Sequence, residues 1–194
     1  MHRPTIKVIA EIGRNHLGDP KRAHRYLDYL LNIDVNSITF QIREKENQLK
    51  KPYTYFDDKN FVDLFDRIRG SGKQIGIAIA DIDYVPFFED LGVDFYKVIR
   101  DDITNKDLLL NLFKTNKEIY VSTGMASEKD ILDFKIFATA KAEDFPHLNK
   151  SIKLVHTQLS NSLSDSNLKS LLEMKRYNFE VAYGHHCEDV LSIF

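Results

Sequence analysis

The chain has 194 residues, with 27 Lys or Arg against 29 Asp or Glu, which gives a formal net charge of −2. A balance this even, with the signs mixed, provides no field that attracts nucleic acid or an acidic membrane, so we expect neither as a partner. No apolar run approaches the ~18 residues of a membrane helix, and no signal peptide is apparent. Together with the single Cys187, which fits a reducing compartment, this predicts a cytoplasmic protein.

Short apolar and β-branched runs recur along the chain and predict seven β-strands separated by helices. The predicted strands are Ile6–Ile12, Ser37–Gln41, Ile75–Ala80, Phe95–Ile99, Glu118–Thr123, Ile152–Thr157 and Phe179–Tyr183. Helix starts are predicted at Asp19 before Pro20, at Asn105, and at Ser127 with Asp130 three residues later. The alternating order and the nearly continuous apolar strands predict an α/β fold with a parallel sheet covered by helices.

The repeat length leaves two parallel architectures open. Strands that start near residues 6 and 179 enclose six repeats of about 29 residues, so eight would take about 230, near the ~250 of a (β/α)8 barrel. A doubly wound open sheet needs only five to seven strands. No dinucleotide-binding glycine motif follows a strand, and 70–73 (Gly-Ser-Gly-Lys) is interpreted as a helix end and turn. Residues Lys141–Lys150 are predicted to form a longer surface loop.

In either architecture the carboxyl ends of the strands carry the chemistry. At these ends the sequence gathers side chains that suit an anionic polar ligand and a metal ion. They are Glu11, Gln41, Lys97, Arg100, Asp102, Ser122, His156, His185 and His186.

Several of these residues stand in ordered motifs. The motifs are Glu11-Ile12-Gly13-x-Asn15-His16-x-Gly18-Asp19, Phe40-Gln41, Tyr96-Lys97 with Thr104-Asn105, Ser122-Thr123-Gly124-Met125 and Tyr183-x-x-His186. In this order the chain resembles the sialic acid synthase family, the phosphoenolpyruvate-dependent N-acetylneuraminate and related nonulosonate synthases. The resemblance implies a TIM (β/α)8-type barrel, followed in the family by a small antifreeze-like domain that reaches into the partner subunit's active site.

The resemblance also implies a reaction and the residues that perform it. Phosphoenolpyruvate would condense with the aldehyde of an N-acetylhexosamine to give a nonulosonic acid and phosphate, while a divalent metal, manganese or alternatively magnesium, polarises the carbonyl. By match to the motifs, Lys97 and Ser122 would bind phosphoenolpyruvate. Glu11 and Gln41 would face the sugar, and His186 would be one of two histidine ligands of the metal.

The chain departs from the family at several of these positions. Thr39 stands where the family has a phosphate-binding lysine, and Arg100 and Asp102 stand where it has a serine and a glutamate. Arg100 is a candidate to restore the lost positive charge, because its planar fork binds phosphate at two points, and Asp102 is the candidate catalytic carboxylate. The loop 159–162 and the Gly184-His185 pair also differ from the family pattern.

The histidines have simpler interpretations from the residues alone. One imidazole does not hold a metal, so His186 needs further ligands. His185 points to the opposite side of an extended chain, and His156 is expected to be packed or hydrogen-bonded. Three functions stay open: a divergent synthase, a non-catalytic homologue that binds a phosphosugar or a protein partner, and another barrel lyase or isomerase acting on a phosphate ester.

Length bears on this choice. Counting strands places Phe194 in the helix after the seventh, about 40 residues short of eight units. We therefore expect residues 1–194 to form one incomplete barrel domain without its eighth unit and without the antifreeze-like domain. Such a chain carries half of the metal site, and we do not expect it to be active alone. The longer protein is expected to be a homodimer.

Overall fold

The computed structural model describes residues 6–188, and it divides the chain into two compact units, Met1–Phe95 and Tyr96–Phe194. The elements of the first unit are β1 (Ile9–Gly13), α1 (Pro20–Leu31), β2 (Ser37–Ile42), α2 (Lys45–Lys50), η1 (Pro52–Thr54), α3 (Asp58–Gly70), β3 (Gln74–Ile79), η2 (Ile82–Tyr84) and α4 (Val85–Asp90). Strand β4 (Phe95–Val98) begins at the end of this unit.

The second unit continues the same alternation. Its elements after β4 are η3 (Asp102–Thr104), α5 (Lys106–Phe113), β5 (Glu118–Ser122), α6 (Glu128–Lys141), α7 (Leu148–Ser151), β6 (Ile152–Thr157), η4 (Leu163–Asp165), α8 (Ser170–Met174), η5 (Lys175–Tyr177) and β7 (Glu180–Gly184). All seven predicted strands are thus present in the described residues, each within about three residues of its predicted start.

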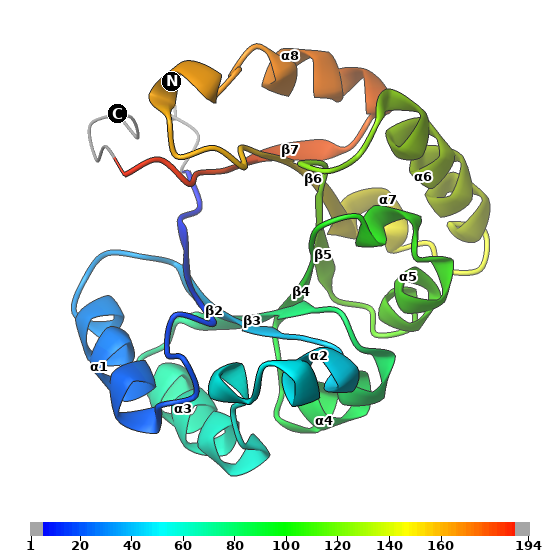
Figure 1. The fold of residues 1–194 in the computed structure, drawn as a ribbon. Helices are drawn as coiled ribbons and strands as arrows, with labels where there is room; N and C mark the ends of the chain where they lie inside the picture. Colours follow the sequence, from blue (N-terminus) through cyan, green and yellow to red (C-terminus); the bar gives the residue numbers. More distant parts are fainter. Residues whose placement is uncertain (1–5, 189–194) are drawn as a thin grey trace. The chain divides into compact units, whose positions relative to one another are not determined.

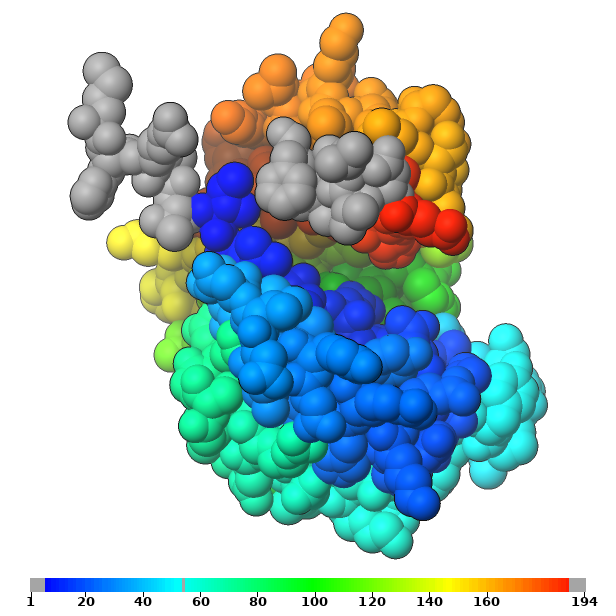
Figure 2. All heavy atoms as spheres, turned by 90° about the vertical axis from the view of Figure 1, so that its left-hand side faces the viewer, coloured from blue at the N-terminus to red at the C-terminus, as the bar shows by residue number. Residues whose placement is uncertain are grey.

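Within each unit the strands pair in parallel and in chain order. β2 pairs with β1 and β3 in the first unit, and β6 pairs with β5 and β7 in the second. The helices cover the outer side of each sheet (Figure 1), as a parallel sheet with apolar strands requires. Helix α1, in blue tones, lies on the surface of the first unit in Figure 2, with Ala23 and Leu27 turned inward and Tyr29 outward.

Small residues shape the inner face of the first sheet. Thr39 of β2 is in register with Gly76 of β3, and the Phe95 ring lies against this glycine. A Cβ atom at position 76 would lie 2.3 Å from two ring carbons of Phe95, so only glycine admits the ring at this place. Thr39 and Phe95 are both fully buried as a result.

The predicted helix starts are confirmed. The Asp19 carboxylate accepts a hydrogen bond from the Lys21 N–H at 2.9 Å. Ser127 and Asp130 form the predicted capping box, in which the Asp130 carboxylate accepts from the Ser127 N–H at 2.8 Å. The predicted turn after α3 is also present, with Gly72 at a φ of +76°. These features are local, which explains why the sequence signals them.

Two predicted segments were wrong in detail. The first strand begins at Ile9 instead of Ile6, because Val8 still bonds to Asn36 ahead of the regular ladder, through the Asn36 N–H and side-chain oxygen. The predicted loop 141–150 contains the start of α7, which begins at Leu148, a buried residue that anchors this turn. Between residues 6 and 188, no helix is both long enough and apolar enough to span a membrane.

Candidate functional site

Glu11 and Gln41 belong to the first unit and lie on adjacent strands. Glu11 of β1 is in register with Thr39, two residues before Gln41 on β2, so alternation places the three side chains on one face of the sheet. The ladder shifts between Glu11 and Gly13, and Gly13 has a φ of +59°. This irregularity ends the strand and brings the Glu11 carboxylate over Gly13, where it is exposed, whereas Gln41 is half-buried.

Thr39 occupies the position where the family resemblance leads one to expect a lysine. Its side chain is fully buried between Glu11 and Gly76 of the neighbouring strands, and its Oγ1 atom has no hydrogen-bond partner among the residues the structure describes. The deepest position of this face is therefore neutral.

Two arginines, which the sequence analysis did not single out as a pair, meet beyond the ends of β1 and β2. Arg43 binds the Glu44 carboxylate through Nε and Nη2, both at 2.8 Å, and its side chain is only 13% exposed. Arg14 donates from Nη1 to the Asn47 side-chain oxygen at 3.3 Å. Burial and the neighbouring positive charge of Arg43 lower the pKa of Arg14 below its usual value. Both guanidinium groups thus converge on the first turn of α2.

His16 follows in the same turn and is held as a neutral imidazole. Its side chain is 1% exposed, its Nδ1 accepts a hydrogen bond from the Gly18 N–H at 3.0 Å, and its ring packs on Phe56 at 4.3 Å between centroids. Burial first, and the positive charge of Arg14 second, lower the pKa of His16 to about 4. This motif histidine is therefore a structural anchor of the β1–α1 turn.

Lys97, Arg100 and Asp102 belong to the second unit. Lys97 lies on β4 and is half-buried. Arg100 adopts a backbone φ of +59°, which is unfavourable for a residue other than glycine. Its side chain pairs with the Asp101 carboxylate at 3.2 Å. Asp102 begins η3 and is 9% exposed. The turn after β4 thus presents a lysine, an arginine and a buried carboxylate within six residues of chain, from 97 to 102.

Ser122 ends β5 and is the centre of a buried hydroxyl cluster. Its Oγ lies 2.8 Å from Oγ1 of Thr157 at the end of β6, and it accepts a long hydrogen bond from the Gly124 N–H at 3.4 Å. Ser122 and Thr123 are each 9% exposed. A Cβ at Gly184, on β7, would lie 3.1 Å from the Thr157 hydroxyl, so glycine leaves room for this pair. Thr157 is a contact that the sequence analysis missed.

The histidines at the ends of β6 and β7 have different surroundings. His156 donates from Nε2 to the Ser166 carbonyl at 2.9 Å and stacks on Tyr183, which confirms its packed role. The His185 ring also lies beside Tyr183, with the ring centroids 5.6 Å apart. His186 is exposed and lies two residues beyond the end of β7.

These positions do not form a metal centre. Residues 6–188 contain no group of three or more His, Cys, Asp and Glu side chains arranged to hold a metal ion. In the second unit His186 is one candidate ligand, and a single imidazole does not retain a divalent ion. The residues described do not fit the expected metal.

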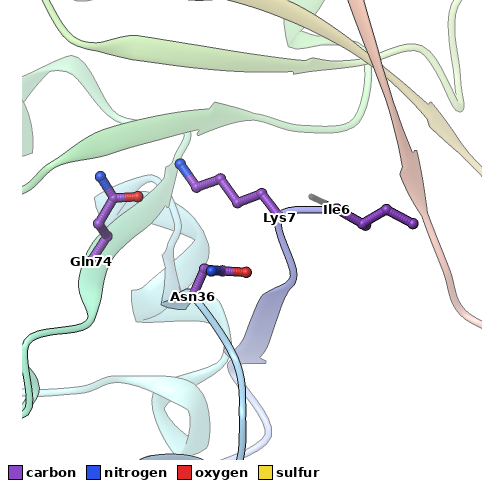
Figure 3. A pocket seen from close by; sticks show the side chains of 4 residues that line it. All are labelled: Ile6, Lys7, Asn36 and Gln74. Carbon is purple, nitrogen blue, oxygen red and sulfur yellow. The ribbon is translucent and has the colours of Figure 1, made fainter. Parts of the chain in front are cut away.

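Two hollows are present among the described residues. One, of about 360 Å³, is lined by Ile6, Lys7, Asn36 and Gln74 at the amino-terminal ends of β1 to β3, where the Lys7 side chain extends toward Gln74 (Figure 3). The other, of about 500 Å³, lies between α6 and the segment from η3 to α5. Barrel enzymes act at the carboxyl-terminal face of the sheet, so the first hollow is not the candidate active site, and the second is a gap between helical segments that contains none of the candidate residues.

Comparison with known proteins decides between the two architectures. The model of the NeuB family matches residues 27–193. The chain belongs to the NeuB family. A solved structure of N-acetylneuraminic acid (sialic acid) synthetase from Leptospira borgpetersenii superposes with a TM-score of 0.81 at 23% identity, covering 100% of this chain and 73% of that one. The predicted resemblance and the α/β fold of the TIM-barrel type are both confirmed.

Two curated relatives of this NeuB-family chain are named as synthases. N,N'-diacetyllegionaminic acid synthase of Campylobacter jejuni is 24% identical over 209 residues, covering 94% of this chain and 61% of that protein. N-acetylneuraminate-9-phosphate synthase of Mus musculus is 29% identical over 141 residues, covering 62% of this chain and 39% of that protein. The chain thus spans about three fifths of the first of these relatives and two fifths of the second.

Proposed function

We propose that this NeuB-family chain carries substrate-binding residues of a sialic acid synthase-type enzyme. In the proposed reaction, C3 of phosphoenolpyruvate bonds to the aldehyde carbon of an N-acetylated hexosamine, water adds at C2 and phosphate leaves, which gives a nonulosonic acid. The observation that carries the proposal is the family match over residues 27–193, within which the motif residues Gln41, Lys97 and Ser122 are retained.

The second unit offers the groups for phosphoenolpyruvate. Its carboxylate and phosphate need cationic and hydroxyl donors, and Lys97, Arg100 and Ser122 supply both kinds. Thr157 acts as a positioning residue, because its Oγ1 lies 2.8 Å from the Ser122 Oγ and fixes that hydroxyl at the strand end. A hydroxyl that is already held in place binds an anion more tightly than one that rotates freely, because less conformational entropy is lost on binding.

The first unit offers groups for the sugar. Glu11 and Gln41 lie on one face of β1 and β2, and a carboxylate with an amide can accept from and donate to sugar hydroxyls. Asp102 is the carboxylate we propose for proton transfer, being nine-tenths buried at the start of η3. The expected divalent metal stays a proposal with His186 as its candidate ligand here, and none of the steps above depends on it.

Binding of phosphoenolpyruvate to the 194-residue chain tests the proposal. We expect saturable binding by isothermal titration calorimetry, weakened at least about tenfold by Lys97→Ala or Ser122→Ala, since a hydrogen bond to a charged group contributes about 1.5–3 kcal/mol. Lys114→Ala, which removes an exposed lysine after α5, is the matched control and should bind as the parent chain does. Absence of phosphoenolpyruvate binding would overturn the proposal.

One observation favours a second function, a non-catalytic homologue. The buried, neutral Thr39 removes a cation that the resemblance leads one to expect. Phosphate release separates the two functions: a synthase releases phosphate from phosphoenolpyruvate when manganese and an N-acetylhexosamine are both supplied. Binding without sugar-dependent release, measured on the longest natural form of the protein, would favour the non-catalytic homologue. The homodimer expected for that longer form is tested in the same preparation by its mass in solution.

A further inference from the structure

Helix α6, on the outside of the second unit (Figure 1), carries apolar side chains on two opposite sides. Its inner side buries Phe134 and Ala138. Its outer side presents Leu132 and Ile136, which are 46% and 60% exposed and stand four residues apart, so they form one stripe along the helix. A surface helix ordinarily has a polar outer side, so an apolar stripe there is typical of a helix that another chain covers.

A hollow beside the stripe extends its apolar surface. This hollow is the one of about 500 Å³ between α6 and the segment from η3 to α5. Its walls include Ile136 together with Ile103, Leu109 and Phe137, all of which belong to the second unit. Because Ile136 belongs to both the stripe and the hollow, the two form one continuous apolar surface.

Charged residues border the stripe on both sides in a balanced pattern. At about 100° per residue, Lys129 and Asp133 lie on one side of the stripe. Glu128 and Lys135 lie on the other side. The Lys129 and Asp133 side chains are joined at 2.5 Å and are 79% and 53% exposed, and Glu128, which binds Arg176 at 2.6 Å, is 74% exposed. Each border thus has one positive and one negative group, so each is complementary to a copy of itself.

We propose that the outer side of α6 forms a contact between two copies of this chain, related by a twofold axis with the two α6 helices antiparallel. In such a pair each border of the stripe faces the same border of the second copy. One register places Lys129 opposite Asp133 of the second copy. The same register, to within about one residue, places Glu128 opposite Lys135 of the second copy. The two Leu132 side chains then lie about 3 Å apart along the helix axes, between the two sets of opposite charges.

The details of the pattern favour the antiparallel pair. In a parallel pair the two different borders face each other, which brings Glu128 toward Asp133 of the second copy, two negative groups. In the antiparallel pair Ile136 faces Ala126 of the second copy, next to Met125, which is 56% exposed. The contact covers roughly half of a helix that is about 21 Å long, so we expect weak association. This contact does not depend on the function proposed above.

Sedimentation equilibrium of the 194-residue chain, between about 5 and 200 µM, tests the contact. We expect the mean mass to rise with concentration toward twice the monomer mass. Leu132→Gln or Ile136→Gln should weaken the association at least about tenfold, because each variant loses an apolar side chain from both copies. Leu172→Gln, which changes a leucine of α8 that is 69% exposed, is the matched control and should associate as the parent chain does.

A charge exchange tests the register. Asp133→Lys leaves two lysines on one border and Lys129→Asp leaves two aspartates there, so neither variant should associate with itself, whereas an equimolar mixture should associate as the parent does. A parent chain that stays monomeric, association that is unchanged by Leu132→Gln, or a mixture that stays monomeric would each overturn the inference. Thermal unfolding checks that each variant is folded. If Leu132→Gln is not, Leu132→Ala takes its place, because alanine favours helices.

Discussion

The buried His16 makes the stability of the chain depend on pH. In the folded chain its pKa is about 4, because its imidazole is buried and Arg14 lies nearby, whereas an unfolded histidine has a pKa of about 6.5. Between these two values the unfolded state binds a proton that the folded state does not. The free energy of unfolding therefore rises with pH in this window, and the stability from the neutral imidazole is lost as pH falls from about 6.5 toward 4.

The magnitude follows from the pKa difference. One pKa unit corresponds to about 1.4 kcal/mol, so the full window is worth about 3 kcal/mol. From this group alone, the chain should be about 2 kcal/mol less stable at pH 5 than at pH 7. That is a large fraction of the ~5–15 kcal/mol by which domains are stable.

Urea unfolding of His16→Asn and the parent chain between pH 4.5 and 8 isolates this contribution. The Asn side-chain oxygen lies close to where Nδ1 lies in histidine, so it can still accept from the Gly18 N–H while removing the titrating ring. We expect the variant to be less stable at pH 7, because the contact with Phe56 is lost, but to lose about 2 kcal/mol less on acidification. His186→Asn, which changes an exposed histidine, is the control.

Parallel pH dependences of the parent chain and His16→Asn would refute this reasoning. They would mean that His16 titrates alike in the folded and unfolded states, and hence that the imidazole is not desolvated. An NMR titration of the His16 ring protons in the folded chain gives an independent reading. It should place the midpoint near pH 4.

Three further predictions follow from the packing, the caps and the site. Gly76→Ala should cost about 1–3 kcal/mol in urea unfolding, because its Cβ would overlap the Phe95 ring, and Phe95→Leu in the same chain should recover part of the loss; an additive double variant would contradict the overlap. Ser127→Ala should lower stability by about 1 kcal/mol in thermal unfolding through loss of the α6 cap, and an unchanged melting temperature would contradict it. Manganese chloride or a chelator should leave the melting temperature of this chain unchanged, whereas a saturable rise abolished by His186→Ala would reveal a metal site.

Much of the fold was predictable because its signals are local. Alternation of apolar runs with capped helices requires only neighbouring residues, and Asp19, Asn105 and Ser127 cap their helices as predicted. The motif residues were also found from the sequence, since each stands at or just beyond a strand end. Strand boundaries were less accurate, as at Val8, where a side-chain hydrogen bond to Asn36 delays the ladder.

The sequence by itself determined the alternating elements, the family and the candidate residues at the strand ends. Only the tertiary structure decided which distant residues meet: Ser122 with Thr157, Arg14 with Asn47 of α2, and Gly76 with Phe95. These contacts depend on strand register and on the turn at Gly13, both of which are set by packing across tens of residues. A charge lost at Thr39 and a cationic pair formed by Arg14 and Arg43 are visible together only when neighbouring strands lie side by side.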